Sequence, residues 1–347
     1  MQEYINSIKK TISVDEIQSL LESFKDLKVL VIGDTIIDHY FFTHLKGRAT
    51  KDPILSVEYK YDEVYAGGIL AIANHLSDFV SSITLVTLIG DQRNKLDFIQ
   101  SALKSNIKPK LFTKKDSPTT VKKRYVNQSR GTKLFKVEYI NDRPIDDTLS
   151  NEILQYLDQE LPKADLVIIG DFGHGFINPQ IRKKLEQSSK FLSANVQSNS
   201  ANMGYNYFSS YEKLDFLTLK EEELRLPLRM RYEKINEVID ESYKKYNFKK
   251  FSVTLGQGGS IHIKDGTQFF APILTTNVKD TIGAGDALFS ITSLLAYKNS
   301  DPRLLAFMGN VSAGIAVNIV GNKESVTKEK IMNFVKGVYN EMGPIQK

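Results

Sequence analysis

Short apolar runs alternate with helical patterns along most of the chain. The runs are typical of strands buried on both faces of a parallel sheet, and they lie at residues 28–38, 81–91, 164–175, 213–219 and 248–259. Apolar positions at helical spacing lie between them, including residues 67–79, 178–191 and 220–226. This alternation predicts an α/β fold with a mostly parallel sheet covered by helices on both faces.

Two stretches instead alternate apolar and polar residues with a period of two. They cover residues 53–65 and 119–139, and Ser129, Arg130 and Gly131 form a predicted turn inside the second. Half-buried antiparallel strands beside a parallel core predict a small β-sheet lid, with segments at about 40–65 and 118–140.

The N-terminal region predicts a helix of its own. Ser13 and Glu16 have the spacing of a capping box ahead of an apolar helical stripe in residues 11–24. We therefore predict an N-terminal helical extension over residues 1–27 and a main α/β domain over residues 28–340.

Composition narrows the class of protein. The chain has 347 residues, of which 41% are hydrophobic and 25% charged, and no run approaches the ~18 apolar residues of a membrane span. It has no cysteine, which excludes disulfides and thiolate sites and, with no secretory signal pattern, favours a cytoplasmic protein. The net charge of +5 is spread along the chain, so we expect no nucleic acid and no membrane partner.

A glycine turn followed by a carboxylate is the strongest chemical signal. Residues 279–289 read KDTIGAGDALF, and an apolar helical pattern follows. The N–H groups of Gly283, Ala284 and Gly285 lie where a helix begins, so they can hold a phosphate or the charge on a transferring phosphoryl. Asp286 can then accept a hydroxyl proton as general base. The alternative is an ordinary turn with an acidic residue in the first helical turn.

Other motifs exclude competing chemistries. There is no GxxxxGK[ST] sequence, no GxGxxG after an early strand, no GxSxG and no metal-ligand spacing among the histidines. Gly/Asp pairs follow three of the predicted strands, at 33–34, 90–91 and 170–171. They lie at the edge where parallel sheets bind ligands, although such residues also form ordinary turns.

DTIGAGDALF resembles the C-terminal signature of the ribokinase-like (PfkB) sugar kinases, and the resemblance extends over about residues 28–335. It implies a three-layer α/β/α sandwich, a β-sheet lid that often mediates a homodimer, and ATP with Mg²⁺ as cofactors. It also implies phosphoryl transfer to a sugar hydroxyl, with Asp286 as the base and the N–H groups of residues 283–285 as the anion hole.

The resemblance also assigns residues on the sugar side. VIGDTIID resembles the family's first strand, whose final aspartate, Asp38, would contact sugar hydroxyls. AGGILAIANHL resembles the double-glycine sugar loop, here Gly67 and Gly68. The chain departs from the family pattern at Ala71, where the usual side chain is a sugar-binding asparagine.

On the nucleotide side, TLGQGG is similar to the family's TxGxxG element and implies contacts from Thr254, Gly256 and Gly259. NVSAGIAVNIVG, at residues 310–321, resembles the helix that covers the adenine pocket.

The element near the phosphates and Mg²⁺ departs from the pattern. It reads KEEE, so Lys220 replaces an asparagine while Glu223 remains as the implied metal ligand. Lys220 either neutralises phosphate charge or displaces the metal. The strand that usually ends in a phosphate element reads SANVQSNSANMGYN, at residues 193–206, where Asn195 and Gln197 can still bind polar groups.

Two segments resemble the heptose-7-phosphate kinase branch, the kinase half of the bifunctional ADP-heptose synthesis enzymes: GRATKDPILSVEY and VKKRYVNQSRGTKLFKVEY. In that branch basic residues near Arg48 or Lys51 would meet a sugar phosphate, and the alternative is that both are solvated charges. We therefore expect an ATP-dependent kinase for a sugar or sugar phosphate in cell-surface carbohydrate synthesis, with any nucleotidyltransferase partner on a separate chain. The alternatives are a catalytically impaired protein that binds a sugar or nucleotide and, more remotely, a nucleoside kinase.

Overall fold

The computed structural model describes residues 1–200 and 202–341. Its main sheet has the strand order β13-β12-β11-β10-β9-β8-β1-β4-β5, which is parallel from β11 to β5 and antiparallel at β12 and β13. The strands are β1 (Lys28–Gly33), β4 (Ser82–Gln92), β5 (Ile107–Pro118), β8 (Leu166–Asp171), β9 (Leu192–Val196), β10 (Phe216–Lys220), β11 (Lys250–Thr254), β12 (Ser260–Lys264) and β13 (Thr267–Ala271). Each of the predicted apolar runs contributes a strand to this sheet.

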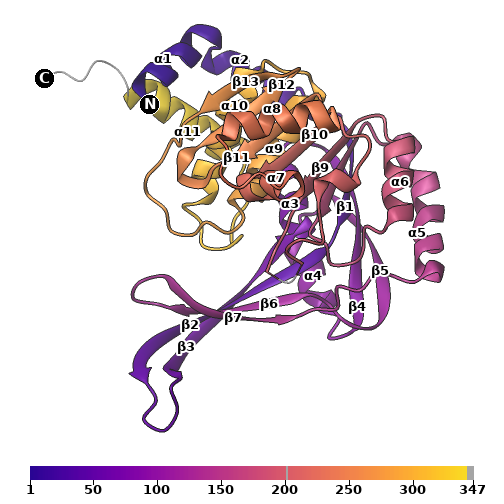
Figure 1. The fold of residues 1–347 in the computed structure, drawn as a ribbon, viewed down its shortest axis with the longest axis vertical. Helices are drawn as coiled ribbons and strands as arrows, with labels where there is room; N and C mark the ends of the chain where they lie inside the picture. The colour runs from indigo at the N-terminus through magenta and orange to yellow at the C-terminus, as the bar shows by residue number, and fades with distance from the viewer. Residues whose placement is uncertain (201, 342–347) are drawn as a thin grey trace, which may run out of the picture.

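Helices cover both faces of the sheet, as Figure 1 shows. One face packs against α1 (Gln2–Thr11), α2 (Val14–Glu22), α3 (Ile69–Leu76), α4 (Leu96–Ala102), α9 (Ala284–Tyr297), α10 (Pro302–Ala316) and α11 (Lys328–Glu341). The other packs against α5 (Asp147–Glu160), α6 (Pro179–Ser188), α7 (Glu221–Leu228) and α8 (Ile235–Tyr246). Along β1, Val29 and Val31 enter the first core while Leu30 and Ile32 enter the second. The predicted three-layer α/β/α architecture is confirmed.

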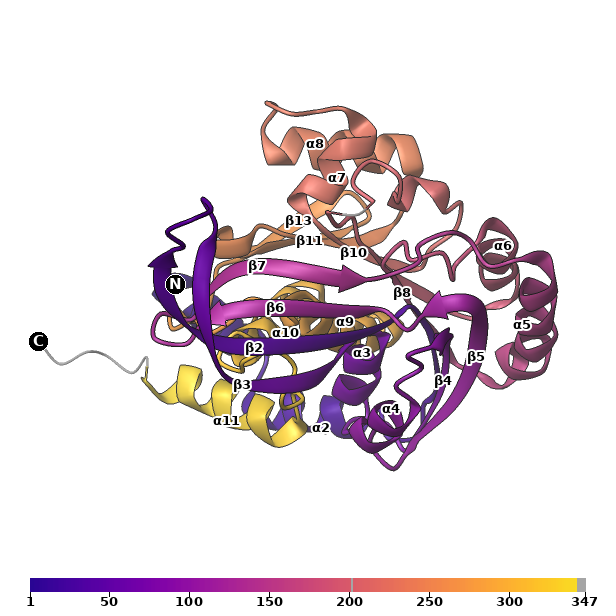
Figure 2. The same cartoon turned by 90° about the horizontal axis from the view of Figure 1, so that it is seen from below.

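A second, mixed sheet forms the lid, with the strand order β3-β2-β6-β7. The central pair β2–β6 is parallel, and the two outer pairs are antiparallel. Its strands are β2 (Thr35–Arg48), β3 (Leu55–Gly68), β6 (Val121–Asn127) and β7 (Thr132–Tyr139). Figure 2 views the molecule from the lid side, where these four strands lie side by side. The lid was predicted, but it begins earlier than residue 40, at Thr35.

This difference corrects the expected position of Asp38. The run at residues 28–38 is two strands rather than one, because β1 ends at Gly33 and β2 leaves for the lid. The break lies at Asp34, whose buried carboxylate accepts the backbone N–H groups of Phe172 (3.0 Å) and His174 (3.2 Å) after β8. Asp38 therefore lies on a lid strand rather than at the end of the first core strand.

The N-terminal helices pack on the main domain. Ser13 caps α2 in a capping box, in which its Oγ accepts the Glu16 N–H and Glu16 Oε2 accepts the Ser13 N–H. Ile5, Ile8 and Ile17 are buried in the same core as the sheet. Within the described part of the chain, no helix has both the length and the apolar character needed to cross a membrane.

Candidate active site

The predicted catalytic turn forms the N-terminus of α9. Gly283 has a φ of +84° and precedes the helix, and a Cβ there would lie 2.1 Å from Oδ1 of Asn322. Only glycine fits this conformation and this close approach. Gly285, in contrast, has no neighbouring atom within 4 Å of the place where a Cβ would lie. The first turn of this 14-residue helix therefore has open space beside it, as an anion site requires.

Asp286 follows this turn as a buried carboxylate with 8% of its surface exposed. Burial raises its pKa from 3.8 to about 7, and the negative charge of Asp38 also raises it. The ammonium of Lys220 and a hydrogen bond from Gln197 act in the opposite direction. A carboxylate that titrates near neutral pH is suited to accept a proton from a hydroxyl.

Gln197 is held in place by the strand behind it. Its Nε2 donates to Oδ1 of Asp286 at 3.1 Å and to Oδ1 of Asn195 at 2.6 Å. Asn195, buried at the end of β9, in turn donates from Nδ2 to the backbone oxygen of Thr218 at 2.8 Å. The amide chain connects the carboxylate to the sheet, so Asn195 acts on Asp286 through Gln197.

The sugar-side residues also come together. Asp38 is buried and forms an ion pair with Arg124 of β6, and a Cβ on Gly67 would lie 2.4 Å from Oδ2 of Asp38. Gly68 has a φ of +55° where β3 gives way to α3. Ala71 is buried inside α3. Asp38, Gly67 and Gly68 thus form one corner, within electrostatic range of Asp286.

Glu223 and Lys220 lie at the start of α7. Glu223 is buried, and its carboxylate accepts the N–H of Lys220 at 2.8 Å and the N–H of Ser198 at 3.0 Å. Burial raises the pKa of Glu223, against the lowering effect of the Lys220 charge. No group of three or more His, Cys, Asp or Glu side chains in residues 1–200 and 202–341 is arranged for a metal ion. Since Mg²⁺ in such sites is held by one or two carboxylates together with phosphates and water, a single carboxylate here fits that donor set.

The nucleotide-side element lies between β11 and β12. Gly256 has a φ of +58° and open space beside it, while a Cβ on Gly259 would lie 2.2 Å from the backbone oxygen of Ala271. Thr254 ends β11 and its hydroxyl lies 3.4 Å from the backbone oxygen of Leu219. Ser260 bonds to Asn310 of α10 at 3.0 Å, so this loop and the predicted adenine-covering helix are neighbours.

Arg48 and Lys51 are not brought to this site. Both are exposed at the tip of the β2–β3 hairpin, which projects away from the body in Figure 1. Ten residues of extended strand separate Arg48 from Asp38, a distance of about 30 Å. Within one chain they do not reach Asp286.

Several functional candidates were missed from the sequence alone. Arg124, Lys122 and Lys136 alternate along lid strands, so the period of two was a signal that they share one face of the lid. His174 follows a Gly/Asp pair that had been identified, but its burial and the effect of the lid lysines on its pKa depend on long-range packing.

A ribokinase-like core, a lid and a carboxylate on a glycine turn together define a carbohydrate kinase. Residues 26–329 match the model of the pfkB family of carbohydrate kinases, and the chain belongs to this family. It is similar to a bifunctional protein HldE of Nitratiruptor sp. (22% identity, 90% of this chain and 65% of that protein). It is also similar to the bifunctional protein HldE of Wolinella succinogenes (26% identity, over 85% of this chain and 62% of that protein). The chain thus spans less than two thirds of the length of both relatives.

Solved structures agree on the fold. Phosphofructokinase-2 from Escherichia coli in complex with substrates and products superimposes with a TM-score of 0.69 at 12% identity, over 90% of this chain and 99% of that one. A ribokinase from Thermotoga maritima superimposes with a TM-score of 0.68 at 16% identity, over 89% of this chain and 99% of that one. At these identities the likeness concerns the fold alone.

Proposed function

We propose that this carbohydrate kinase transfers the γ-phosphoryl of ATP to a hydroxyl of a sugar or sugar phosphate of the heptose-phosphate type. The observation that carries the proposal is the joint position of Asp286 and the α9 N-terminus beside Asp38. Asp286 accepts the hydroxyl proton, while the N–H groups of residues 283–285 stabilise the charge on the phosphoryl. Asp38 orients the sugar through its hydroxyl groups.

Kinases of this family use ATP and a divalent metal, which supplies charge neutralisation of the nucleotide phosphates. In this chain Glu223 would supply the single carboxylate for Mg²⁺. Lys220 is the N-cap residue of α7, and its charge lowers the pKa of Asp286, which supports a role for Lys220 in neutralising the nucleotide phosphates. Thr254, Gly256 and Gly259 would border the nucleotide.

The heptose-phosphate assignment rests on the HldE relatives and on the lid segments that resemble the heptose-7-phosphate kinases. We place the reaction in cell-surface carbohydrate synthesis on the same grounds. A panel of free and phosphorylated heptoses and hexoses, each with ATP and Mg²⁺, tests the proposal through coupled detection of ADP. The proposal would be contradicted if no sugar in the panel gave more ADP with the wild type than with the Asp286→Asn variant.

The lid also suggests a homodimer. An aromatic ladder crosses its outer face, in which Phe41 stacks on Tyr125 (4.9 Å between ring centroids) and Tyr125 on Phe135 (4.4 Å). Tyr59 extends the ladder onto β3. Tyr59 and Phe135 are 57% and 45% exposed, so this apolar surface is available to a second copy of the chain.

A further inference from the structure

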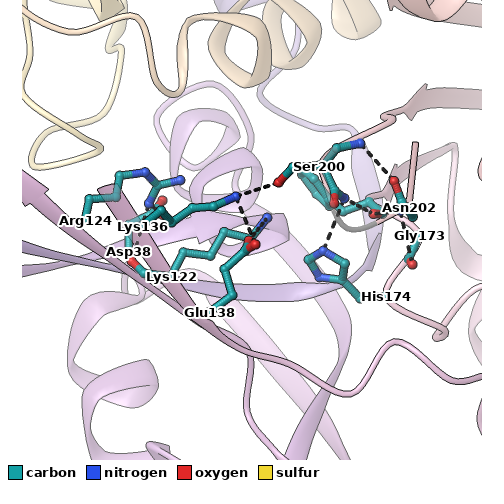
Figure 3. Close-up of polar contacts among 11 residues, drawn as sticks. Asp38, Lys122, Arg124, Lys136, Glu138, Gly173, His174, Ser200 and Asn202 are labelled. Carbon is teal, nitrogen blue, oxygen red and sulfur yellow. Dashed lines mark hydrogen bonds and ion pairs between the residues drawn. The ribbon is translucent and has the colours of Figure 1, made fainter. Parts of the chain in front are cut away.

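The inner face of the lid carries a group of charged side chains beside Asp38. The strand register places Asp38, Lys122 and Glu138 in one row across β2, β6 and β7, and Arg124 and Lys136 in the next row on the same face. Figure 3 shows these side chains together, with the loop that carries Ser200 beside them. Three cations and two carboxylates leave this cluster with a surplus of one positive charge.

The two lysines are arranged differently. Lys136 Nζ lies 2.9 Å from Oε2 of Glu138 and donates to Ser200 Oγ, also at 2.9 Å. Lys122 is only 7% exposed, and its distance to Oε1 of Glu138 is 3.7 Å, longer than a hydrogen bond. Burial lowers the pKa of Lys122, while Glu138 and Asp38 raise it. A buried ammonium with so loose a partner favours a further anion beside it.

His174 supplies a second, independent observation. Its ring is 4% exposed, and Nδ1 has no hydrogen-bond partner among the described residues. Nε2 lies 3.5 Å from the Nδ2 of Asn199, which can only donate, so the ring proton is on Nδ1. Burial, followed by Lys122, Lys136 and Lys114, lowers the pKa of His174 to about 3, so the ring is neutral. The ring thus carries a buried N–H donor that has no acceptor among the described residues, and it lies within electrostatic range of Lys122 and Lys136.

The loop that closes this region is fixed to the core by its amides. Asn199 and Asn202 donate to the backbone oxygen of Phe172 at 2.9 and 2.8 Å, and Asn202 also lies within 3.3 Å of the Gly173 oxygen (Figure 3). These bonds hold Ser200 against the lid. The loop therefore contacts Lys136 through Ser200 and His174 through Asn199.

We propose that Lys122, Lys136 and the Nδ1–H of His174 form a subsite for an anionic group on the acceptor, so that the substrate of this kinase is a sugar phosphate. This subsite rests on the proposed function, and it names the residues of this chain that would bind the phosphate of the acceptor. Lys122 stands in the same row as Asp38, so the subsite adjoins the sugar corner. The acceptor would be held by its phosphate at the lid and by its hydroxyls at Asp38. Arg48 and Lys51 have no part in it.

The test measures binding without ATP, by isothermal titration of the full chain with sedoheptulose 7-phosphate, glucose 6-phosphate and the two unphosphorylated sugars. The variants are Lys122→Met and Lys136→Met, which keep the stem and remove the charge. The matched control is Lys123→Met, because Lys123 lies on the outer face of the same strand over Phe41 and Tyr139. Circular dichroism verifies folding, and two separate lysine variants guard against a failure of one of them.

We expect wild type and Lys123→Met to bind at least one sugar phosphate tenfold or more tightly than its free sugar. Lys122→Met and Lys136→Met should each lose at least tenfold of that preference. An unchanged preference in both variants, or no preference in wild type, would overturn the subsite. ADP formation with free sugars alone would overturn the subsite and leave the kinase intact, whereas phosphate-dependent binding without ADP formation would leave the subsite and overturn the kinase proposal.

Discussion

The Nε2 amide of Gln197 lies 3.1 Å from Oδ1 of Asp286 and donates a hydrogen bond to it. A donor of this kind stabilises the ionised carboxylate, against burial and the nearby charge of Asp38. The same amide group is held by Asn195 at 2.6 Å, so its position does not depend on a ligand. The pair of contacts keeps the proposed base ionisable close to neutral pH.

Replacing Gln197 by leucine removes this donor from the carboxylate. We expect the pKa of Asp286 to rise and the acidic limb of the kcat/KM profile to move up by about one to two pH units, since a hydrogen bond to a charged group contributes roughly 1.5–3 kcal/mol. The measurement is a pH–rate profile with saturating ATP. Gln268→Leu, on the distant strand β13, is the control. A pH–rate profile identical to that of wild type would show that Gln197 does not influence the pKa of the proposed base.

Replacing Asp286 by asparagine keeps its shape and removes the proton acceptor. Turnover should fall by about 10²–10⁴-fold, which is the usual contribution of general base catalysis. ATP affinity should change little, because the N–H groups of the turn remain. Steady-state rates and nucleotide titration of the same preparation check both statements. Turnover equal to wild type would exclude Asp286 as the base.

The same substitution should stabilise the protein at high pH. Since burial raises the pKa of Asp286 from 3.8 to about 7, the unfolded chain ionises before the folded one, and the folded state loses relative stability as pH rises between these values. The loss is at most about 4 kcal/mol above pH 7. Asp286→Asn should melt at a higher temperature than wild type at pH 8 and at a similar temperature at pH 4. Equal melting at both pH values would contradict the shift.

Gly285 offers a test of the proposed anion hole. A methyl group there meets no neighbouring atom within 4 Å, and alanine favours a helix over glycine by about 1 kcal/mol. Gly285→Ala should therefore be at least as stable as wild type, yet turn over at least tenfold more slowly because the methyl group occupies the space of the phosphoryl. Thermal melting and ADP formation are compared on one sample. Full turnover would show that the phosphoryl lies elsewhere.

Much of this architecture follows from local pattern. The apolar runs of the core strands, the capping box at Ser13 and the period of two in the lid are all short-range signals, and each gave the observed element. The strand break at Asp34 was missed because β2 begins with buried residues on both faces, from Thr35 to Asp38, which hides the period of two.

The contacts of the site could not be predicted in the same way. Arg124 reaches Asp38 across 86 residues of sequence, and Tyr40 reaches Asp280 across 240. The first pair depends on the pairing of β2 with β6 inside the lid, and the second depends on how the lid lies over the core. No local pattern encodes either relationship. The sequence identified the proposed catalytic turn, whereas its partners on the lid needed the structure.

Asp280 connects the lid to the catalytic turn. Its Oδ2 accepts the hydroxyl of Tyr40 on β2 at 2.8 Å, and its Oδ1 accepts Nζ of Lys133 on β7 at 2.5 Å. The backbone N–H groups of Ile282 and Gly321 complete the set. Burial alone would raise the pKa of Asp280, but these donors outweigh it and the pKa is lowered.

Asp280→Asn should destabilise the protein by about 2 kcal/mol at pH 7, less than for a fully buried ion pair because Lys133 is 36% exposed. Because the pKa of Asp280 is lowered in the folded state, its ionisation stabilises the fold above pH 3.8, the ordinary pKa of an aspartate, and this stabilisation is lost as the pH falls toward the lowered pKa. The difference in stability between wild type and Asp280→Asn should therefore shrink toward pH 3. Urea unfolding at both pH values measures this. Asp62→Asn, an exposed lid carboxylate, is the control, and an equal loss in both variants would contradict the connection.

The aromatic ladder on the outer face of the lid makes a final prediction about assembly. The double variant Tyr59→Lys, Phe135→Lys puts two charges into this face, whose centre is formed by Phe41 and Tyr125. A dimer that forms through this face should therefore dissociate. Light scattering should give twice the chain mass for wild type and the chain mass for the double variant. Tyr232→Lys, at a residue that is 86% exposed outside the lid, should stay dimeric. If the wild-type chain is monomeric, or if the double variant stays dimeric, the lid does not mediate a dimer.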